Sequence, residues 1–300
     1  MPPEGNHGVA LVTGATGYLG GRLARRLLAV GRRVVVLARL GADTSALEAD
    51  GIAVIRDDGS TAGLAAAVAA CAPQSVFHLA ARFVARHTIA DVDDLVASNL
   101  GLPTRLAEAT VAAGCRVFVT AGTAWQLDAD GHERPHGLYA AMKQAAESIY
   151  AHYAASDGLK VACLRLYETW GPADPRRKLL PLLLSTLRSG ETLALSPGEQ
   201  RLDFVHVDDV IAAFLHAEAR LHAAEPGRFE RFSVRTGRPV SIRELVAHIE
   251  RAAGRPLPVA FGARPYRPDE IMFPPPGEIL PGWQARISWD EGLAPLVAEG

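Results

Sequence analysis

The feature that most constrains the fold is the segment LVTGATGYLGGRL, in which an apolar run leads into three glycines and then a helical pattern. The glycines follow the predicted strand 9–13 in the pattern G-x-x-G-x-x-G. Glycines at such a junction permit a tight turn and a close approach of the backbone, and the helix N-terminus then faces an anion. The segment predicts a cradle for the phosphates of a dinucleotide cofactor, made by Gly14, Thr16, Gly17, Tyr18, Leu19 and Gly20.

Short β-rich runs alternate with helical patterns through the first half of the chain. The predicted strands are 9–13, 33–38, 52–56, 75–80, 116–121 and 160–166. Apolar strands joined by helical crossovers are typical of an α/β fold with a doubly wound parallel sheet of the Rossmann type.

After about residue 167 the chain becomes proline-rich and irregular, and helices are predicted near 177–189, 207–222 and 241–253. We therefore predict a Rossmann domain over 1–166, completed by strands that return from the C-terminal half. Residues 167–300 are predicted to form mainly a smaller substrate-binding domain, because such sites are often built from loops on a rigid scaffold.

The formal net charge of −2 gives no indication of bulk electrostatic binding to nucleic acid or to a membrane surface. The first eight residues do not resemble a signal peptide, and no apolar run has transmembrane length. The three cysteines are Cys71, Cys115 and Cys163; each lies in or beside an apolar segment, and none forms a CxxC pair. We expect reduced thiols, no metal ligands and a cytoplasmic location.

The end of the second predicted strand bears on the choice of cofactor. A fold that binds NAD usually has an acidic residue there for the ribose hydroxyls, but Ala38 and Arg39 occupy this turn. A guanidinium suits a 2′-phosphate, so we favour NADP(H) over NAD(H). The alternative is a solvated surface arginine.

Tyr139 and Lys143 stand four residues apart in GLYAAMKQAAESIY, which has a helical pattern. Residues at this spacing share a helix face. A tyrosine titrates near ~10 in water, so it needs a cationic neighbour to act as an acid or base near neutrality. We predict that both residues are catalytic and that they also contact the cofactor.

Taken together, TGATGYLG, HLAA (78–81), a hydroxyl-bearing turn after 116–121 and YAAMK resemble the extended short-chain dehydrogenases/reductases. The resemblance is to the NAD-dependent epimerase/dehydratase family of nucleotide-sugar enzymes. It continues through CLRLYETWGPADPRRKLLPLLL, FVHVDDVIAAF and YRPDE, and so covers most of the chain. It implies a nucleotide-diphosphate sugar as substrate and a homodimer formed through helices at about 91–113 and 137–155.

The resemblance also implies further contacts to the cofactor. Asp58 would contact the adenine amino group, Asn99 would brace the helix beneath the active site, and Lys143 would hold the nicotinamide ribose. Without the resemblance, Asp58 is a capping carboxylate and Asn99 a polar residue inside a helix. The remaining implied cofactor contacts are Leu79, Ala80, Ala81 and Thr120.

The strand at 116–121 departs from the family pattern. Aligning AWQ with the family's Val-Tyr-Gly puts Ala121 where the catalytic hydroxyl usually stands, and Thr123 two residues later. Because side chains two apart on an extended segment face the same way, we expect Thr123 to supply the hydroxyl and Thr120 to face the opposite side. A local gap would instead favour Thr120, and a third possibility is a hydroxyl that only caps the turn.

The same alignment disfavours sugar dehydration. The family's 4,6-dehydratases place an Asp-Glu pair after the hydroxyl, whereas this chain has Gly122 and Thr123. Neither residue can act as a carboxylate acid or base.

Candidate substrate contacts follow from the later motifs. Glu168 stands where many relatives carry an asparagine, and Leu202 replaces a diphosphate-binding arginine that Arg201 could supply from one residue earlier. Arg267 in YRPDE matches the family's other such arginine, and the basic cluster 176–178 either meets phosphate or is solvated. The predicted substrate-binding residues are Arg82, Thr123, Trp125, Glu168, Lys178, Arg201 and Arg267.

Within the family, the sequence most resembles reductases that act on 4-keto-6-deoxy sugar nucleotides linked to dTDP or CDP. In that reaction NADPH reduces the C4 ketone, Tyr139 protonates the oxygen and Thr123 hydrogen-bonds the developing alkoxide. The alternative is a nucleotide-sugar 4-epimerase with tightly bound NAD. A redox-sensing binding protein would not need Tyr139, and reductases of small ketones or acyl thioesters normally lack an arginine such as Arg267.

Overall fold

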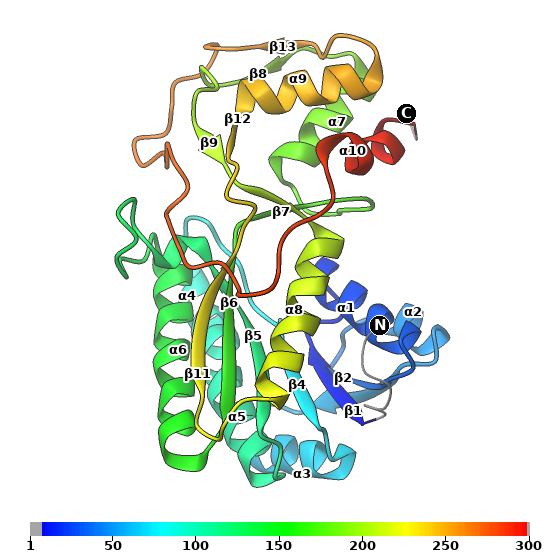
Figure 1. The fold of residues 1–300 in the computed structure, drawn as a ribbon, viewed down its shortest axis with the longest axis vertical. Helices are drawn as coiled ribbons and strands as arrows, with labels where there is room; N and C mark the ends of the chain where they lie inside the picture. Colours follow the sequence, from blue (N-terminus) through cyan, green and yellow to red (C-terminus); the bar gives the residue numbers. More distant parts are fainter. Residues whose placement is uncertain (1–7, 299–300) are drawn as a thin grey trace.

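The computed structural model describes residues 8–298, and its centre is a seven-stranded parallel sheet with the order β11-β6-β5-β4-β1-β2-β3 (Figure 1). Its strands are β1 (Val9–Thr13), β2 (Arg33–Arg39), β3 (Ala53–Asp57), β4 (Ser75–His78), β5 (Val117–Thr123), β6 (Lys160–Leu166) and β11 (Phe229–Val234). Every neighbouring pair is parallel. The predicted Rossmann-type fold is confirmed.

Most of the strands are apolar through their middle because both faces of the sheet are covered by helices. Ala10 and Val12 of β1 pack into one core with α1 and α8, whereas Leu11 between them packs into a second core with α3, α5 and α6. Side chains alternate along a strand, so one short run supplies both cores.

The helices follow the predicted patterns closely. They are α1 (Tyr18–Ala29), α2 (Ser45–Ala49), α3 (Thr61–Cys71), α4 (Val92–Val96), α5 (Leu102–Ala112), α6 (Leu138–Asp157), α7 (Leu179–Ser189), α8 (Val207–His222), α9 (Ile242–Ala253) and α10 (Trp289–Ala298), with short turns η1 (Ile89–Asp91), η2 (Ala97–Gly101) and η3 (Ala124–Gln126). The helix expected over 91–113 is continuous through α4, η2 and α5, but η2 is a π-helical turn. No helix of residues 8–298 is long and apolar enough to span a bilayer.

A smaller unit lies beyond the carboxyl edge of the sheet, at the top of Figure 1. It contains α7, α9 and α10, which share a third core. Its short strands pair two by two, and they are β7 (Glu168–Trp170) with β10 (Phe204–His206), β8 (Leu193–Ala194) with β13 (Val259–Ala260), and β9 (Arg201–Leu202) with β12 (Val240–Ser241).

The chain passes between the two units several times. Strand β11 pairs with β6, and α8 packs on β5 and β6, although both follow residue 167. The segment 271–287 then runs back from the smaller unit toward the sheet and is tied to α8 (Figure 1). There the Asp209 carboxylate accepts hydrogen bonds from the N–H groups of Arg286 and Ile287, and the Asp209 carbonyl accepts one from Trp283 Nε1.

Candidate functional site

Two adjoining cavities lie along the carboxyl edge of the sheet. The first has a volume of about 370 Å³ and runs from the glycine turn to the ends of β2 and β3. The second has a volume of about 280 Å³ and lies between the end of β5, α6 and the smaller unit. Leu79 and Ala81 line both cavities, so the two form one continuous cleft, which we call the cofactor cavity and the catalytic cavity.

The glycine turn forms the floor of the cofactor cavity. Gly14 has a φ of 75° and packs so closely on the loop after β4 that a Cβ atom would lie 2.6 Å from the backbone nitrogen of Ala80. The N–H of Gly17 donates to the Gly14 carbonyl at 3.0 Å, which closes the turn before α1. A Cβ on Gly20 would collide with the same carbonyl. The turn therefore requires these glycines, and it suits the close approach of a pyrophosphate.

Other predicted cofactor residues line this cavity as well. They are Thr16, Arg39, Leu79, Ala80 and Ala81. The Arg39 guanidinium forms no hydrogen bond or ion pair with any residue between 8 and 298, and it is exposed at the rim. This cation is free to meet a ligand.

At the β3 end of the cavity, Asp57 lines the wall and Asp58 does not. The Asp58 carboxylate accepts hydrogen bonds from the N–H and hydroxyl of Ser60, and these bonds lower the pKa of its carboxyl group. Asp57 is paired with Arg105 at 3.1 Å. Asp57 and not Asp58 borders the cavity because β3 ends at Asp57 instead of residue 56, and a contact of Asp58 with the adenine stays a prediction.

Asn99 is fully buried in η2 and contacts the loop after β4 instead of the cavity. Its amide accepts from the Arg82 N–H at 3.1 Å and donates to the Arg82 carbonyl at 2.9 Å. The Arg82 side chain pairs with Asp91 and Asp94 and lines the cofactor cavity but not the catalytic cavity, and its contact with the substrate stays a prediction.

Three further residues expected at the cofactor do not line the cofactor cavity. The Tyr18 ring packs against Arg22 and Arg176, and its hydroxyl donates to the Pro172 carbonyl. Leu19 lines the catalytic cavity. Thr120 is buried and donates to the His78 carbonyl at 3.2 Å, away from both cavities.

The catalytic cavity brings together the three residues predicted to be catalytic. Thr123 from the end of β5 and Tyr139 and Lys143 from α6 all line it. Thr123 is extended, with φ −142° and ψ 145°, and its hydroxyl also accepts a 3.3 Å hydrogen bond from the Trp125 N–H. The structure thus places the two threonines on opposite sides of β5.

Burial controls the titration of the pair on α6. It raises the pKa of Tyr139 to about 12 and lowers the pKa of Lys143 to about 8. The cationic neighbour that the sequence suggests for Tyr139 does not lower its pKa, because desolvation of the phenol dominates. Tyr139 therefore stays protonated at neutral pH, which suits a proton donor. Its ring meets the edge of Phe83 at 5.0 Å.

The outer wall of the catalytic cavity is polar and carries both signs of charge. Lys178 donates to Glu168 at 2.8 Å, and both line the cavity. Arg176, from the same basic cluster, also lines it and pairs with Asp174. Trp125 lines the cavity and packs against Phe83, with the two ring planes tilted by 58°.

Two predicted substrate arginines do not reach the cavity. Arg201 pairs with Glu244, whereas Leu202 beside it lines the wall. The two alternate along β9, so only one of them faces inward. Arg267 is exposed and does not line the cavity.

Several lining residues were missed in the sequence. They are Phe83, Tyr167, Thr169, Asp203, Ile271, Pro274 and Pro275. Asp203 follows Leu202 in a recognisable motif, so its position was open to prediction. The residues from 271 to 275 carry no periodic pattern that would place them.

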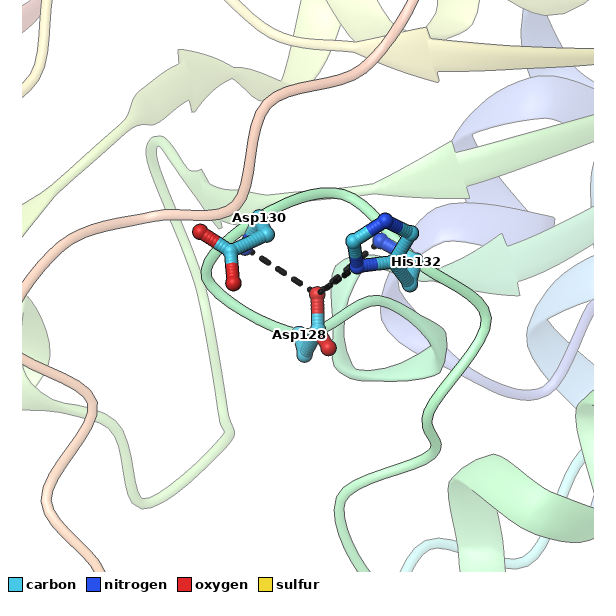
Figure 2. Close-up of side chains that lie close together, drawn as sticks. All are labelled: Asp128, Asp130 and His132. Carbon is cyan, nitrogen blue, oxygen red and sulfur yellow. Dashed lines mark hydrogen bonds and ion pairs between the residues drawn. The ribbon is translucent and has the colours of Figure 1, made fainter.

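The loop after η3 brings together Asp128, Asp130 and His132 (Figure 2). Their ligand atoms lie within 4.8 Å of one another. The Asp128 carboxylate accepts hydrogen bonds from the N–H groups of Asp130 and His132, which closes the loop. All of this is explained by an aspartate turn.

Comparison with known proteins adds a family and several relatives. Residues 10–232 match the model of the NAD dependent epimerase/dehydratase family. A UDP-glucose 4-epimerase of Mycolicibacterium smegmatis is 30% identical over 320 residues, covering 96% of each chain. A CDP-abequose synthase of Yersinia pseudotuberculosis is 27% identical over 208 residues, which cover 67% of this chain and 70% of that protein.

A solved structure extends the similarity to three dimensions. MoeE5 in complex with UDP-glucose and NAD superposes with a TM-score of 0.81 and 28% sequence identity, covering 97% of this chain and 98% of that one.

Proposed function

Because this chain belongs to the NAD dependent epimerase/dehydratase family, we propose that it reduces the C4 ketone of a nucleotide-activated 4-keto-6-deoxy sugar, linked to dTDP or CDP, with NADPH. The observation that carries this proposal is the single cleft in which Thr123, Tyr139 and Lys143 adjoin the glycine cradle. The similarity to CDP-abequose synthase over two thirds of the chain supports a deoxysugar substrate.

Each residue of the catalytic cavity has a separate role in the proposed reduction. The cofactor, when bound, supplies hydride to the C4 carbon. Tyr139, protonated at neutral pH, donates a proton to the C4 oxygen, and the Thr123 hydroxyl donates a hydrogen bond to that oxygen as it gains charge. Lys143 carries the positive charge of the site below pH of about 8. Arg176 and Lys178 are the cations of the cavity wall that suit the sugar diphosphate.

The carboxylates of the cavity do not suit dehydration. Within residues 8–298, Glu168 and Asp203 are the acidic residues that line the catalytic cavity. Glu168 is paired with Lys178, and Asp203 accepts hydrogen bonds from the N–H and hydroxyl of Thr236 and from the N–H of Gly237. Both are engaged as acceptors, so neither resembles a free acid–base pair beside Tyr139.

The preference for NADPH depends on Arg39. Its guanidinium at the rim has no partner among residues 8–298 and suits a 2′-phosphate. We expect Arg39→Asp to weaken NADPH binding at least about tenfold while leaving NADH binding equal or stronger, because the carboxylate repels the phosphate and accepts from the ribose hydroxyls. Titration calorimetry with both cofactors measures this. Equal affinities of the unmodified protein for NADH and NADPH would remove the preference from the proposal.

A second candidate is a nucleotide-sugar 4-epimerase with tightly held NAD. It is favoured by the 30% identical UDP-glucose 4-epimerase and by the similarity to a complex that contains UDP-glucose and NAD. The same three catalytic residues would serve both reactions.

One experiment separates the two candidates. The purified protein is incubated with NADPH and with dTDP- or CDP-linked 4-keto-6-deoxyglucose, the loss of NADPH absorbance is followed, and the configuration at C4 of the product is determined. Consumption of one NADPH per ketone supports the reductase. A protein that contains stoichiometric NAD and interconverts UDP-glucose with its C4 epimer, without net redox, is the epimerase.

We also propose a homodimer formed through the α4–α5 run and α6. These helices pack on each other along one side of the sheet, and Val96 on α4 is exposed. Light scattering is expected to give twice the chain mass of 31.9 kDa.

A further inference from the structure

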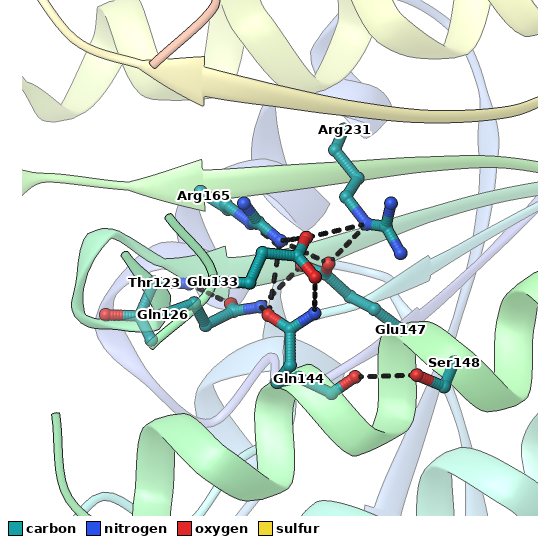
Figure 3. A network of polar contacts seen from close by, with 8 residues as sticks. All are labelled: Thr123, Gln126, Glu133, Gln144, Glu147, Ser148, Arg165 and Arg231. Carbon is teal, nitrogen blue, oxygen red and sulfur yellow. Dashed lines mark hydrogen bonds and ion pairs between the residues drawn. The ribbon is translucent and has the colours of Figure 1, made fainter. Parts of the chain in front are cut away.

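Gln126 lies at the end of η3, directly after the turn that carries Thr123, and its side chain is fully buried (Figure 3). The Gln126 Oε1 atom accepts from the Thr123 N–H at 2.8 Å. Its Nε2 atom donates to Gln144 Oε1 at 3.0 Å and to Glu147 Oε1 at 2.7 Å. A flipped amide would set its NH₂ group against the Thr123 N–H and its oxygen against two acceptors. The orientation is therefore determined by its partners.

Glu147 holds the far side of this amide. Its buried carboxylate accepts from Arg165 Nε at 3.2 Å, from the Arg165 terminal nitrogen at 2.7 Å and from Arg231 Nε at 2.7 Å. Arg165 also pairs with Glu133 at 2.9 Å. Two arginines from β6 and β11 thus fix a glutamate of α6, as Figure 3 shows. The Gln126, Glu147 and Arg165 side chains of this network are buried and hydrogen-bonded, and a buried network with its polar groups satisfied is rigid.

Gly122 provides the space for the network. A Cβ atom at this position would lie 2.7 Å from Gln126 Oε1, 3.1 Å from Arg165 Cγ and 3.2 Å from Glu147 Oε1. The residue that argues against dehydration in the sequence is therefore also the one that admits the Gln126 amide beneath β5. Gly122 directly precedes Thr123, so the amide supports the strand where it enters the catalytic cavity.

We infer that Gln126 is a positioning residue, which fixes Thr123 in the catalytic cavity and is itself held by Glu147, Arg165 and Arg231. The role rests on the proposed function, because it consists in aiming the Thr123 hydroxyl at the reacting oxygen. Gln126 lines neither cavity, so its effect on the reaction is indirect, and its direct contact with the catalytic set is the hydrogen bond from the Thr123 N–H.

The geometric part is tested without any turnover. In Gln126→Leu the Thr123 N–H loses its acceptor, so hydrogen exchange of that amide should accelerate at least about tenfold. This acceleration is counted after correction for any change in the global free energy of unfolding. Ser148→Ala is the matched control, since the Ser148 hydroxyl donates to the Gln144 carbonyl at the edge of the network. An unchanged Thr123 exchange rate in Gln126→Leu would overturn the inference.

The catalytic part is tested with a double-mutant cycle in the ketosugar assay. We expect Gln126→Leu to lower kcat about 10- to 100-fold, with KM for the sugar nucleotide changed less than about twofold. In a Thr123→Val background the same substitution should change kcat less than about twofold, because the hydroxyl that it positions is gone. A purely structural role would cost the same in both backgrounds, and that result would refute the positioning role.

A charge-conserving swap covers the case in which Gln126→Leu does not fold. Gln126→Glu alone places a carboxylate against Glu147, so kcat should fall. Adding Glu147→Gln restores one donor and one acceptor between the two positions, and kcat should recover at least about tenfold. No recovery in a folded double variant contradicts the inference. If the unmodified protein reduces neither ketosugar, the proposed function fails, while the Thr123 exchange rate still decides whether Gln126 fixes the turn.

Discussion

At the scale of single residues, Thr120 and Thr123 lie three positions apart on one strand but have different surroundings. Thr120 donates to the His78 carbonyl inside the sheet, whereas Thr123 lines the catalytic cavity beside Tyr139. Residues an odd number apart on a strand face opposite sides. Only one of the two hydroxyls can therefore reach a substrate.

Replacing these hydroxyls should have different effects. Thr123→Val is expected to lower kcat about 100-fold, because a hydrogen bond to the developing alkoxide is lost. Thr120→Val should lower the free energy of unfolding by about 1 kcal/mol and change kcat less than about threefold. Steady-state kinetics and urea denaturation of both variants measure this. Loss of activity confined to Thr120→Val would reverse the assignment.

Lys143 links the site to stability. Its pKa is near 8 in the folded chain against an ordinary value of 10.5, so between these pH values the unfolded chain binds more protons. The contribution of Lys143 to the free energy of unfolding therefore rises with pH across that window. The cost of burying its charged ammonium is greatest below pH 8. Lys143→Met should stabilise the cofactor-free protein at pH 7 by on the order of 1–3 kcal/mol and abolish activity.

Denaturation with urea at pH 7 and pH 10.5 checks this expectation. Lys160→Met, at a residue whose ammonium only contacts the carbonyls of residues 222 and 224, is the control and should not stabilise. A Lys143→Met protein less stable than the parent at pH 7 would contradict the account.

The sequence predicted that Thr123, Tyr139 and Lys143 lie together, because strand and helix periods determine which side chains share a face, and all three line one cavity. Asp58 and Arg201 line neither cavity, for the same reason. A shift of one residue in a strand turns a side chain to the other side, and strand ends are the least predictable positions. The Gln126 network was missed because its members lie on four separate elements and their contacts have no sequence pattern.

At the scale of secondary-structure elements, the packing of the first turn of α1 against the glycine turn determines the shape of the cofactor cavity. Gly20 on its first turn packs against the Gly14 carbonyl so closely that there is no room for a Cβ atom. Most helices were predictable to within a few residues, because each repeats an apolar face. The π-helical turn η2, which presents Asn99 to the backbone of Arg82, leaves no such signal.

Gly20→Ala should therefore displace α1 from the glycine turn. We expect a loss of at least 1–3 kcal/mol in the free energy of unfolding and at least about tenfold weaker cofactor binding. Gly101→Ala is the matched control, because its Cβ would meet only an ordinary contact of 3.7 Å with the Val96 carbonyl, and it should bind cofactor normally. Calorimetric titration with NADPH and NADH distinguishes the two variants. Normal binding by Gly20→Ala would show that the turn tolerates a shift.

At the scale of the whole molecule, the segment 271–287 joins the two units. Ile271, Pro274 and Pro275 line the catalytic cavity, and the Asp209 carboxylate on α8 holds the far end of the segment. Asp209 is thus one of several groups that anchor this segment, and Tyr167 and Arg235 donate to the Pro275 carbonyl at its cavity end. The path of this segment could not be predicted, since it has neither helical nor strand periodicity.

Asp209→Ala leaves the N–H groups of Arg286 and Ile287 without their acceptor. We expect a Tm lower by about 2–8 °C and a KM for the sugar nucleotide raised several-fold, with cofactor affinity unchanged. Asp208→Ala, at the exposed neighbouring residue, is the control. A KM identical to that of the parent would mean that the segment keeps its place without Asp209.

The place of β11 in the sheet has a consequence for synthesis of the chain. Strand β6 is buried over Val161–Arg165 and pairs on one side with β11, which the ribosome makes more than sixty residues later. During that interval β6 is an open, apolar edge, and such edges recruit other strands. Nascent chains that end near residue 225 should therefore aggregate or remain bound to chaperones, whereas chains that extend past Val234 should not. Sedimentation of ribosome-released fragments of both lengths measures this aggregation. It would show whether pairing of β11 with β6 is the step that prevents it.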